Sequence, residues 1–239
     1  AGADTINGLA GNDTINGSAG ADTIDGGLDI DTISYSASAA AVTVNLALTT
    51  AQSGGDAQGD KLSNIENATG SAFNDTLAGN GSNNILTGGN GNDTLTGAAG
   101  ADKIDGGAGT DTVSYTASTA AVNANLALTT AQSGGYAAGD ILSNIENVIG
   151  SAFADTLTAI ATGSTLTGGA GADTIKGGAG IDTVSYASST AAVNVNLALT
   201  TAQSGGDAAG DTLFTIENII GSAFNDTLTG TLAANNING

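Results

Sequence analysis

Aspartate residues recur every nine positions in this chain, beginning with Asp4, Asp13, Asp22 and Asp31. Most of them end a glycine-rich loop, and the loop Gly88-Gly89-Asn90-Gly91-Asn92-Asp93 is among the best preserved. Glycine tolerates positive φ, so such a loop can turn sharply and aim its carbonyl oxygens inward. Carboxylate and carbonyl oxygens together suit Ca²⁺, which takes about 6–8 oxygen ligands. The spacing therefore predicts a series of loops that bind several Ca²⁺ ions.

The candidate ligands are the side chains at the repeating position and the glycines of the loops before them. The side chains are Asp4, Asp13, Asp22, Asp31, Asp75, Asn84, Asp93, Asp102, Asp111, Asp155, Asp173, Asp182 and Asp226. The glycines are Gly89, Gly91, Gly107, Gly109, Gly169, Gly171, Gly178 and Gly180. Further acids at Asp60, Asp140 and Asp211 are either extra calcium ligands or solvated acidic turns.

The element that must position these loops is a short strand. Each aspartate is followed by one residue, most often Thr, then by a large apolar residue and a third residue, as in Asp93-Thr94-Leu95-Thr96. Since strand side chains alternate, the middle residue points into a core. Two nine-residue units then close one flattened coil, and residues eighteen apart lie one above the other. Stacking predicts the pairs Asp4 with Asp22, Asp13 with Asp31, Asp75 with Asp93, Asp93 with Asp111 and Asp155 with Asp173. Carboxylates stacked so closely repel unless a cation lies between them.

A longer repeat interrupts the regular arrays. The sequence NLALTTAQSGG occurs at 45–55, 125–135 and 196–206. We expect one continuous solenoid over 1–239, with regular nonapeptide arrays near 1–34, 70–114, 150–185 and 221–239. Longer irregular coils lie near 35–69, 115–149 and 186–220, and each contains a short alternating strand such as 42–46. Counting nine residues back from Asp75 reaches Glu66, whose role stays open between structure and metal ligation, as do those of Glu146 and Glu217.

Some residues depart from the nonapeptide pattern. Ser164 replaces an acid, which puts the site shared with Asp182 in doubt. Phe73, Phe153 and Phe224 stand where a loop glycine is expected, and we expect differently shaped loops with the phenylalanine capping the core. Tyr35, Tyr115 and Tyr186 each follow a core position, and we expect them to pack over the start of a longer coil with their hydroxyls in water.

Composition excludes several function classes. The chain has 23 acids against 3 bases, a formal net charge of -20, and no His or Cys. Such a charge repels nucleic acids and anionic membranes, so we expect neither as a partner, and no run of apolar residues is long enough for membrane insertion. Without His or Cys no catalytic triad or zinc site is possible, and no catalytic residue is predicted.

The in-register nonapeptides of the form GGxGxD-x-apolar-x resemble the RTX (repeats-in-toxin) family of haemolysin-type calcium-binding repeats. The resemblance covers the regular arrays. It implies an all-β fold, a right-handed parallel β-roll or β-helix solenoid that forms on binding Ca²⁺, here with three longer irregular coils. It also implies type I secretion from a Gram-negative bacterium and hence a location outside the cell or on its surface.

Three functions fit these observations. The first is a structural module of a bacterial extracellular protein, such as an adhesin stalk, a surface-layer subunit or a filament segment. The second is the calcium-dependent folding and secretion domain of an enzyme or toxin. The third is ice binding by outward threonine ladders, which the interruptions by long coils disfavour. Because the chain starts and stops within repeats, we expect neighbouring repeats of a larger chain, or copies stacked end to end, as partners.

Overall fold

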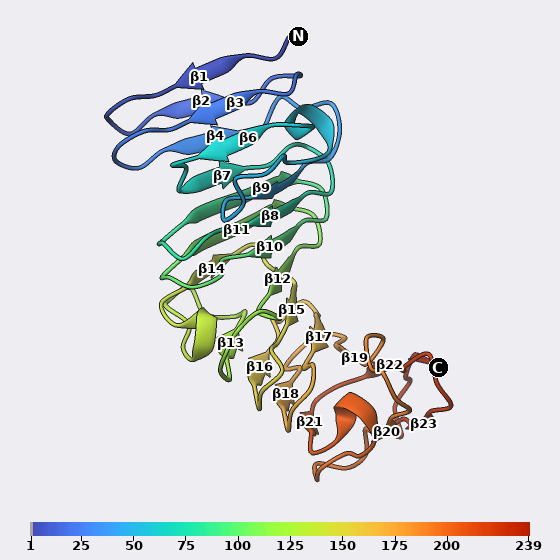
Figure 1. Cartoon of the computed structure of the whole chain (residues 1–239). Helices are drawn as coiled ribbons and strands as arrows, with labels where there is room; N and C mark the ends of the chain where they lie inside the picture. Colours follow the sequence, from blue (N-terminus) through green and yellow to red (C-terminus); the bar gives the residue numbers. More distant parts are fainter. Residues whose placement is uncertain (1) are drawn as a thin grey trace. The chain divides into compact units, whose positions relative to one another are not determined.

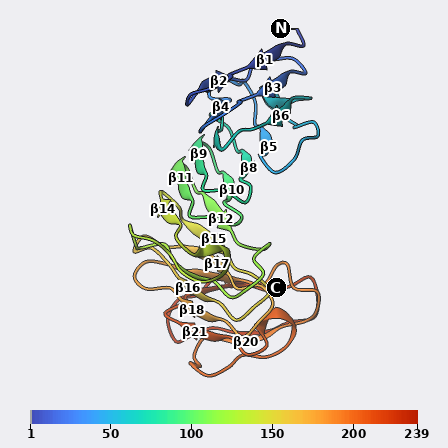
Figure 2. The same cartoon turned by 60° about the vertical axis from the view of Figure 1, so that its left-hand side comes forward.

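The computed structural model describes residues 2–239, and its regular secondary structure consists almost entirely of short parallel strands (Figure 1). The chain divides into two compact units. The first contains Ala1–Val113 and Gly139–Ile145, and the second contains Ser114–Ala138 and Glu146–Gly239. Both units are solenoids in which the chain winds into coils and each strand pairs with strands one coil away (Figure 2).

Three sheets build the first unit, with strand orders β1-β3-β6, β2-β4-β7-β9-β11-β14 and β5-β8-β10-β12. Its strands are β1 Thr5–Asn7, β2 Thr14–Asn16, β3 Thr23–Asp25, β4 Thr32–Ser34, β5 Thr43–Asn45, β6 Lys61–Ser63, β7 Asn67–Thr69, β8 Thr76–Ala78, β9 Ile85–Asn90, β10 Thr94–Thr96, β11 Lys103–Ala108, β12 Thr112–Ser114 and β14 Ile141–Ser143. Its 3-10 helix is η1 Gly55–Ala57.

The second unit has the same construction, with strand orders β13-β16-β18-β21, β15-β17-β19-β22-β24 and β20-β23. Its strands are β13 Asn123–Asn125, β15 Asn147–Ile149, β16 Thr156–Thr158, β17 Thr165–Thr167, β18 Thr174–Lys176, β19 Thr183–Ser185, β20 Asn194–Asn196, β21 Thr212–Phe214, β22 Asn218–Ile220, β23 Thr227–Thr229 and β24 Ile237–Asn238. Its 3-10 helices are η2 Gly135–Ala137 and η3 Gly206–Ala208.

The apolar residue in the middle of each strand forms the core, as the sequence predicts. Leu77, Leu95 and Val113 are fully buried and stack on successive coils of the first unit. Leu157 and Ile175 do the same in the second unit. One buried side chain per strand gives a narrow core, which explains how so few aromatic residues suffice. Burial of these side chains orients every loop, because the aspartate directly precedes the strand.

The predicted eighteen-residue register is confirmed. Thr5 pairs with Thr23, Thr14 with Thr32 and Thr76 with Thr94, so the aspartates before them lie one above the other. Residues nine apart belong to different sheets, which puts successive loops at different edges of the coil.

The longer coils end one sheet and begin another. In the first unit, β5 begins the sheet β5-β8-β10-β12 and β6 ends the sheet β1-β3-β6. Between these strands the chain folds back, with Thr43 and Ser53 forming an antiparallel bridge, and then passes through η1. The alternating strand predicted within 42–46 is therefore confirmed as β5. Over residues 2–239, no helix has the length and hydrophobicity required to cross a membrane.

Candidate metal-binding loops

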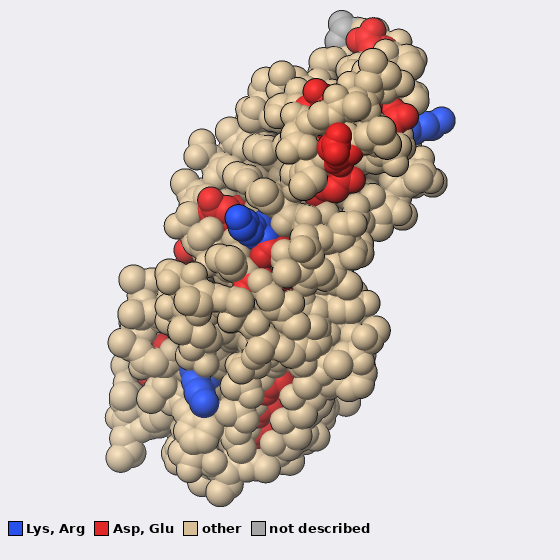
Figure 3. All heavy atoms as spheres, turned by 90° about the vertical axis from the view of Figure 1, so that its left-hand side faces the viewer, with Lys and Arg blue, Asp and Glu red and all other residues tan. Residues whose placement is uncertain are grey.

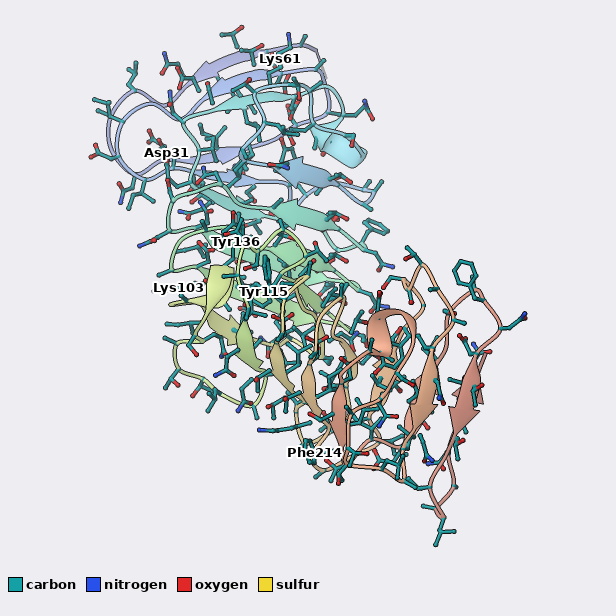
Figure 4. All side chains as sticks on the ribbon, turned by 60° about the horizontal axis from the view of Figure 1, so that its bottom comes forward. Asp31, Lys61, Lys103, Tyr115, Tyr136 and Phe214 are labelled. Atoms are coloured by element: carbon teal, nitrogen blue, oxygen red, sulfur yellow. The ribbon has the colours of Figure 1, made fainter. Side chains whose placement is uncertain are left out.

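Each candidate loop connects the end of one strand to the start of the next, with its aspartate as the last residue. Asp31, between β3 and β4, lies at such an edge (Figure 4). All eight loop glycines predicted from the sequence have positive φ; Gly107 and Gly109, for example, have φ of 100° and 151°. A Cβ atom at either position would also collide with a backbone carbonyl of the preceding coil. Glycine is therefore required here both for the turn and for the close approach of neighbouring coils.

One oxygen of each repeating carboxylate holds the neighbouring coil. The Asp75 backbone N–H donates to Asp93 Oδ1 at 2.7 Å, and the Asp93 N–H donates to Asp111 Oδ1 at 2.7 Å. The same bond links Asp4 to Asp22, Asp13 to Asp31, Asn84 to Asp102, Asp102 to Asp140, Asp155 to Asp173 and Ser164 to Asp182. We call each such column of residues a carboxylate ladder. A backbone N–H donor therefore lies between successive carboxylates of a ladder.

In several aspartates of the ladders the second oxygen has no protein partner. The atoms concerned are buried and make no hydrogen bond: Oδ2 of Asp13, Asp31, Asp93, Asp102, Asp173 and Asp182. Such an atom requires a cation or a proton, since a buried charged oxygen without a partner is strongly destabilising. On the face shown in Figure 3, acidic atoms form small red areas between tan neighbours, in keeping with their burial.

Backbone carbonyls of the next coil lie beside these oxygens. A Cβ atom placed on Gly88 would contact both Asp93 Oδ2 and the carbonyl oxygen of Gly106, one coil further on. A Cβ atom on Gly26 would likewise contact Asp31 Oδ2 and the Asn64 carbonyl oxygen. The missing side chain thus leaves a small cradle bordered by one carboxylate and one carbonyl oxygen. This oxygen-only donor set fits a hard cation such as Ca²⁺.

The glycine five residues before the aspartate was missed as a site residue by sequence reasoning, which selected the second and fourth loop positions. It is Gly88 for Asp93 and Gly26 for Asp31. The sequence could have indicated this position, because glycine is kept there even in loops that lack the second and fourth glycines, such as Gly70-Ser71-Ala72-Phe73.

Burial raises the pKa of several carboxyls that face the cradles. The pKa of Asp93 is raised to about 6, that of Asp102 to about 7 and that of Asp173 to about 8. Desolvation is the largest cause in each, and neighbouring carboxylates add to it, whereas the backbone N–H bond acts in the opposite direction. A bound cation would favour the ionised forms.

Among residues 2–239, no group of three or more acidic side chains is arranged to hold a metal ion. A cation in these loops would therefore depend on backbone carbonyls and on single carboxylates from different loops. That division of ligands agrees with the glycine-rich sequence.

Several predicted ligands have all their polar atoms engaged by the protein. Asp75 Oδ1 accepts hydrogen bonds from the Val42 N–H and the Ser71 hydroxyl, and its Oδ2 accepts from the Ser71 N–H. Asp155 and Asp226 have equivalent partners. In the third such loop, hydrogen bonds from Ser222 and Val193 outweigh the effect of burial and lower the pKa of Asp226.

The amide of Asn84 is also satisfied. Its Oδ1 accepts from the Asn80 N–H, and its Nδ2 donates to the Glu66 carbonyl and to Asn80 Oδ1. We therefore revise our expectation for Asn84: its amide nitrogen occupies the side of the loop where a cation would be held. Ser164, which replaces an acid at the repeating position, accepts a hydrogen bond from the Ile160 N–H on its hydroxyl.

Glu66 and Glu217 have a structural role. Glu66 Oε2 accepts from the Asp31 N–H and Glu217 Oε2 from the Asp182 N–H, both at 2.9 Å. They continue the ladder across a longer coil, where the extra methylene spans the altered path.

Two expectations about aromatic residues were wrong. Tyr35 and Tyr186 are buried, and their hydroxyls donate to Asp60 Oδ2 and Asp211 Oδ2 at 2.8 Å instead of contacting water. Tyr115 is also buried, and Figure 4 shows it among the coils. The side chains of Phe73, Phe153 and Phe224 are 44%, 44% and 52% exposed, so they do not cap the core. The serine-to-aspartate bonds of these loops turn the phenylalanine outward.

Comparison with known families agrees with this geometry. The sequence model described as the RTX calcium-binding nonapeptide repeat (4 copies) matches residues 1–33, 63–95, 78–113, 149–184 and 215–239. The chain belongs to this RTX repeat family. No curated protein matched the chain. The family assignment makes the chain a calcium-binding repeat module with a parallel β-roll, and the RTX repeat is a structural element with no catalytic chemistry of its own.

Proposed function

We propose that this chain is a structural module of a secreted bacterial RTX-type protein, located outside the cell or on its surface, that folds when it binds Ca²⁺. The observation that carries the proposal is the set of buried Asp Oδ2 atoms without protein partners. The loops of Asp13, Asp31, Asp93, Asp102, Asp173 and Asp182 are the proposed calcium sites, and those of Asp13, Asp31, Asp93 and Asp182 have the carbonyl oxygen of another coil beside the carboxylate.

The charge balance explains why folding would depend on the ion. The chain carries a formal net charge of -20 and buries carboxylates that cannot all be neutralised by three lysines. Bound Ca²⁺ supplies positive charge to the unpartnered oxygens, and the binding free energy then contributes to folding. Low free calcium in the cytosol would keep the chain unfolded for export, and higher calcium outside would let it fold.

A structural role is supported better than ice binding. On the sheet β5-β8-β10-β12 the first strand position is Thr43, Thr76, Thr94 and Thr112, a regular ladder. On the sheet β2-β4-β7-β9-β11-β14 the same position is Thr14, Thr32, Asn67, Ile85, Lys103 and Ile141. The threonine ladder is thus short and confined, whereas the coil stacking extends through each unit.

A calcium titration followed by far-UV circular dichroism tests the proposal. Starting in EDTA, we expect a cooperative gain of β signal with Ca²⁺ and none with Mg²⁺, which demands a more regular octahedral shell. A full β signal already present in EDTA would contradict calcium-driven folding.

A variant pair tests the assigned sites. Asp93→Ala should be especially harmful, because its carboxylate links two coils and faces a cradle. We expect a calcium midpoint at least several-fold higher than in the wild type. Asp56→Ala is the matched control, since Tyr136 occupies the equivalent place in the middle repeat. Equal midpoints for both variants would argue against the proposed site.

A further inference from the structure

The aspartates that open a ladder after a longer coil, and two that end a ladder, accept more hydrogen bonds than aspartates between them such as Asp93. Where a longer coil opens a new ladder, its first carboxylate lies in a loop with the sequence GSAF, four residues beyond the serine. The residues beneath Asp75, Asp155 and Asp226 are Val42, Val122 and Val193, which have no side-chain oxygen, so the ladder begins at the aspartate.

Serine supplies the donors that an interior aspartate lacks. In the loop ending at Asp75, the Ser71 hydroxyl donates to Oδ1 at 2.8 Å and the Ser71 N–H donates to Oδ2. Together with the Val42 N–H, three donors converge on one carboxylate. Asp93, the next residue of the same ladder, receives only the Asp75 N–H on Oδ1, and its Oδ2 has no hydrogen bond.

A tyrosine hydroxyl supplies the missing donor at the last carboxylate of two ladders. The ladder of Asp4 and Asp22 ends at Asp60, whose Oδ1 accepts from the Asp22 N–H and whose Oδ2 accepts from the Tyr35 hydroxyl. Tyr35 also fills the space beside Asp22, one coil away in the same ladder, because a Cβ atom on Gly17, five residues before Asp22, would collide with the tyrosine ring.

The second unit repeats this arrangement. Its ladder of Asp155 and Asp173 begins with a serine loop and ends at Asp211, where the Tyr186 hydroxyl donates to Oδ2. Asp173, between them, has an unpartnered Oδ2.

We propose that serine and tyrosine hydroxyls take the place of calcium at the aspartates of the GSAF loops, which open a ladder, and at Asp60 and Asp211, which end one, so that Ca²⁺ is confined to loops whose aspartate Oδ2 has no protein donor. Asp75, Asp155 and Asp226, with Asp60 and Asp211, then bind no ion. This inference rests on the proposed calcium binding of the interior loops.

Crystals of the wild-type chain grown with Ca²⁺ provide a test that needs no variant to fold. Anomalous scattering from calcium would locate each ion. We expect peaks beside interior residues such as Asp93 and Asp173 and none beside the terminal carboxylates. A peak beside Asp75, Asp155, Asp226, Asp60 or Asp211 would overturn the inference and leave the proposed function intact. Absence of every peak would overturn both.

Ion counting on the whole chain by native mass spectrometry gives an independent check with matched variants. Asp93→Asn should lower the number of bound Ca²⁺ by at least one. Asp75→Asn, one coil away in the same ladder, should keep the wild-type number and lower only the melting temperature. Loss of an ion from folded Asp75→Asn would refute the confinement of calcium, whereas an unchanged count in Asp93→Asn would refute the calcium site itself.

Discussion

Removing one buried hydroxyl, with Tyr186→Phe, should destabilise the calcium-loaded protein substantially. The hydroxyl lies 2.8 Å from Asp211 Oδ2, and both residues are almost completely inaccessible to solvent. Loss of the donor leaves an ionised oxygen buried without a partner, which costs about 1–3 kcal/mol or more for a charged group. We take about 3 kcal/mol for the loss in free energy of unfolding. For a chain of this size that is a fall of roughly 6–12 °C in melting temperature.

Differential scanning calorimetry at saturating Ca²⁺ measures this fall. Tyr136→Phe is the control, because Tyr136 is partly exposed and its hydroxyl has no hydrogen bond within residues 2–239; its melting temperature should stay near that of the wild type. The deficit of Tyr186→Phe should also shrink on acidification. Burial raises the pKa of Asp211 to about 6, so near or below that pH the carboxyl takes up a proton and the missing donor matters less. A wild-type melting temperature for Tyr186→Phe at pH 8 would refute the role of the hydroxyl.

Three further predictions concern the loops and the core. Gly107→Ala should lower the melting temperature in Ca²⁺ by an amount equivalent to about 1–3 kcal/mol, because φ is 100° and the new Cβ would collide with the Gly89 carbonyl; Gly81→Ala, where the space is open, should be neutral. Leu95→Ala, which empties a fully buried core position, should cost about 2–5 kcal/mol in urea unfolding at saturating Ca²⁺, and a cost below 1 kcal/mol would contradict the packed core. In EDTA the β signal in circular dichroism should be larger at pH 5 than at pH 8, because burial raises the folded-state pKa of Asp173 to about 8 whereas the unfolded value is about 4. Protonation of Asp173 therefore stabilises the fold below pH 8, and this stabilisation is lost as the pH rises through 8. An identical β signal at pH 5 and pH 8 would contradict the raised pKa of Asp173.

The register of the coils could be predicted from the sequence because spacing alone decides which residue lies above which. A period of nine with one core residue per unit puts Asp93 above Asp75 and below Asp111, and the hydrogen bonds confirm that order. The direction of each carboxylate oxygen could not be predicted, because it depends on where the backbone N–H of the neighbouring coil points.

The path of the chain within the longer coils could not be predicted. Asp31 and Glu66 are separated by 35 residues, which is not a multiple of nine, so the period gives no path between them. The buried position of Tyr35 follows from that path: the ring occupies the space above Gly17 that another loop would fill in a regular coil. A tyrosine next to a predicted turn gave no sign that its hydroxyl would meet an acid 25 residues further along the chain.

The alternation of loops between different edges of the coil has a consequence for how such a chain changes during evolution. Gain or loss of one nonapeptide is half a revolution, so every later loop moves to the other edge, whereas gain or loss of eighteen residues restores the original edge. The longer coils starting after Asp31 and Asp111 are separated by 80 residues and therefore leave from different ladders. Selection for the ladder from which an insert leaves would therefore be recorded as parity in the number of repeats between two inserts.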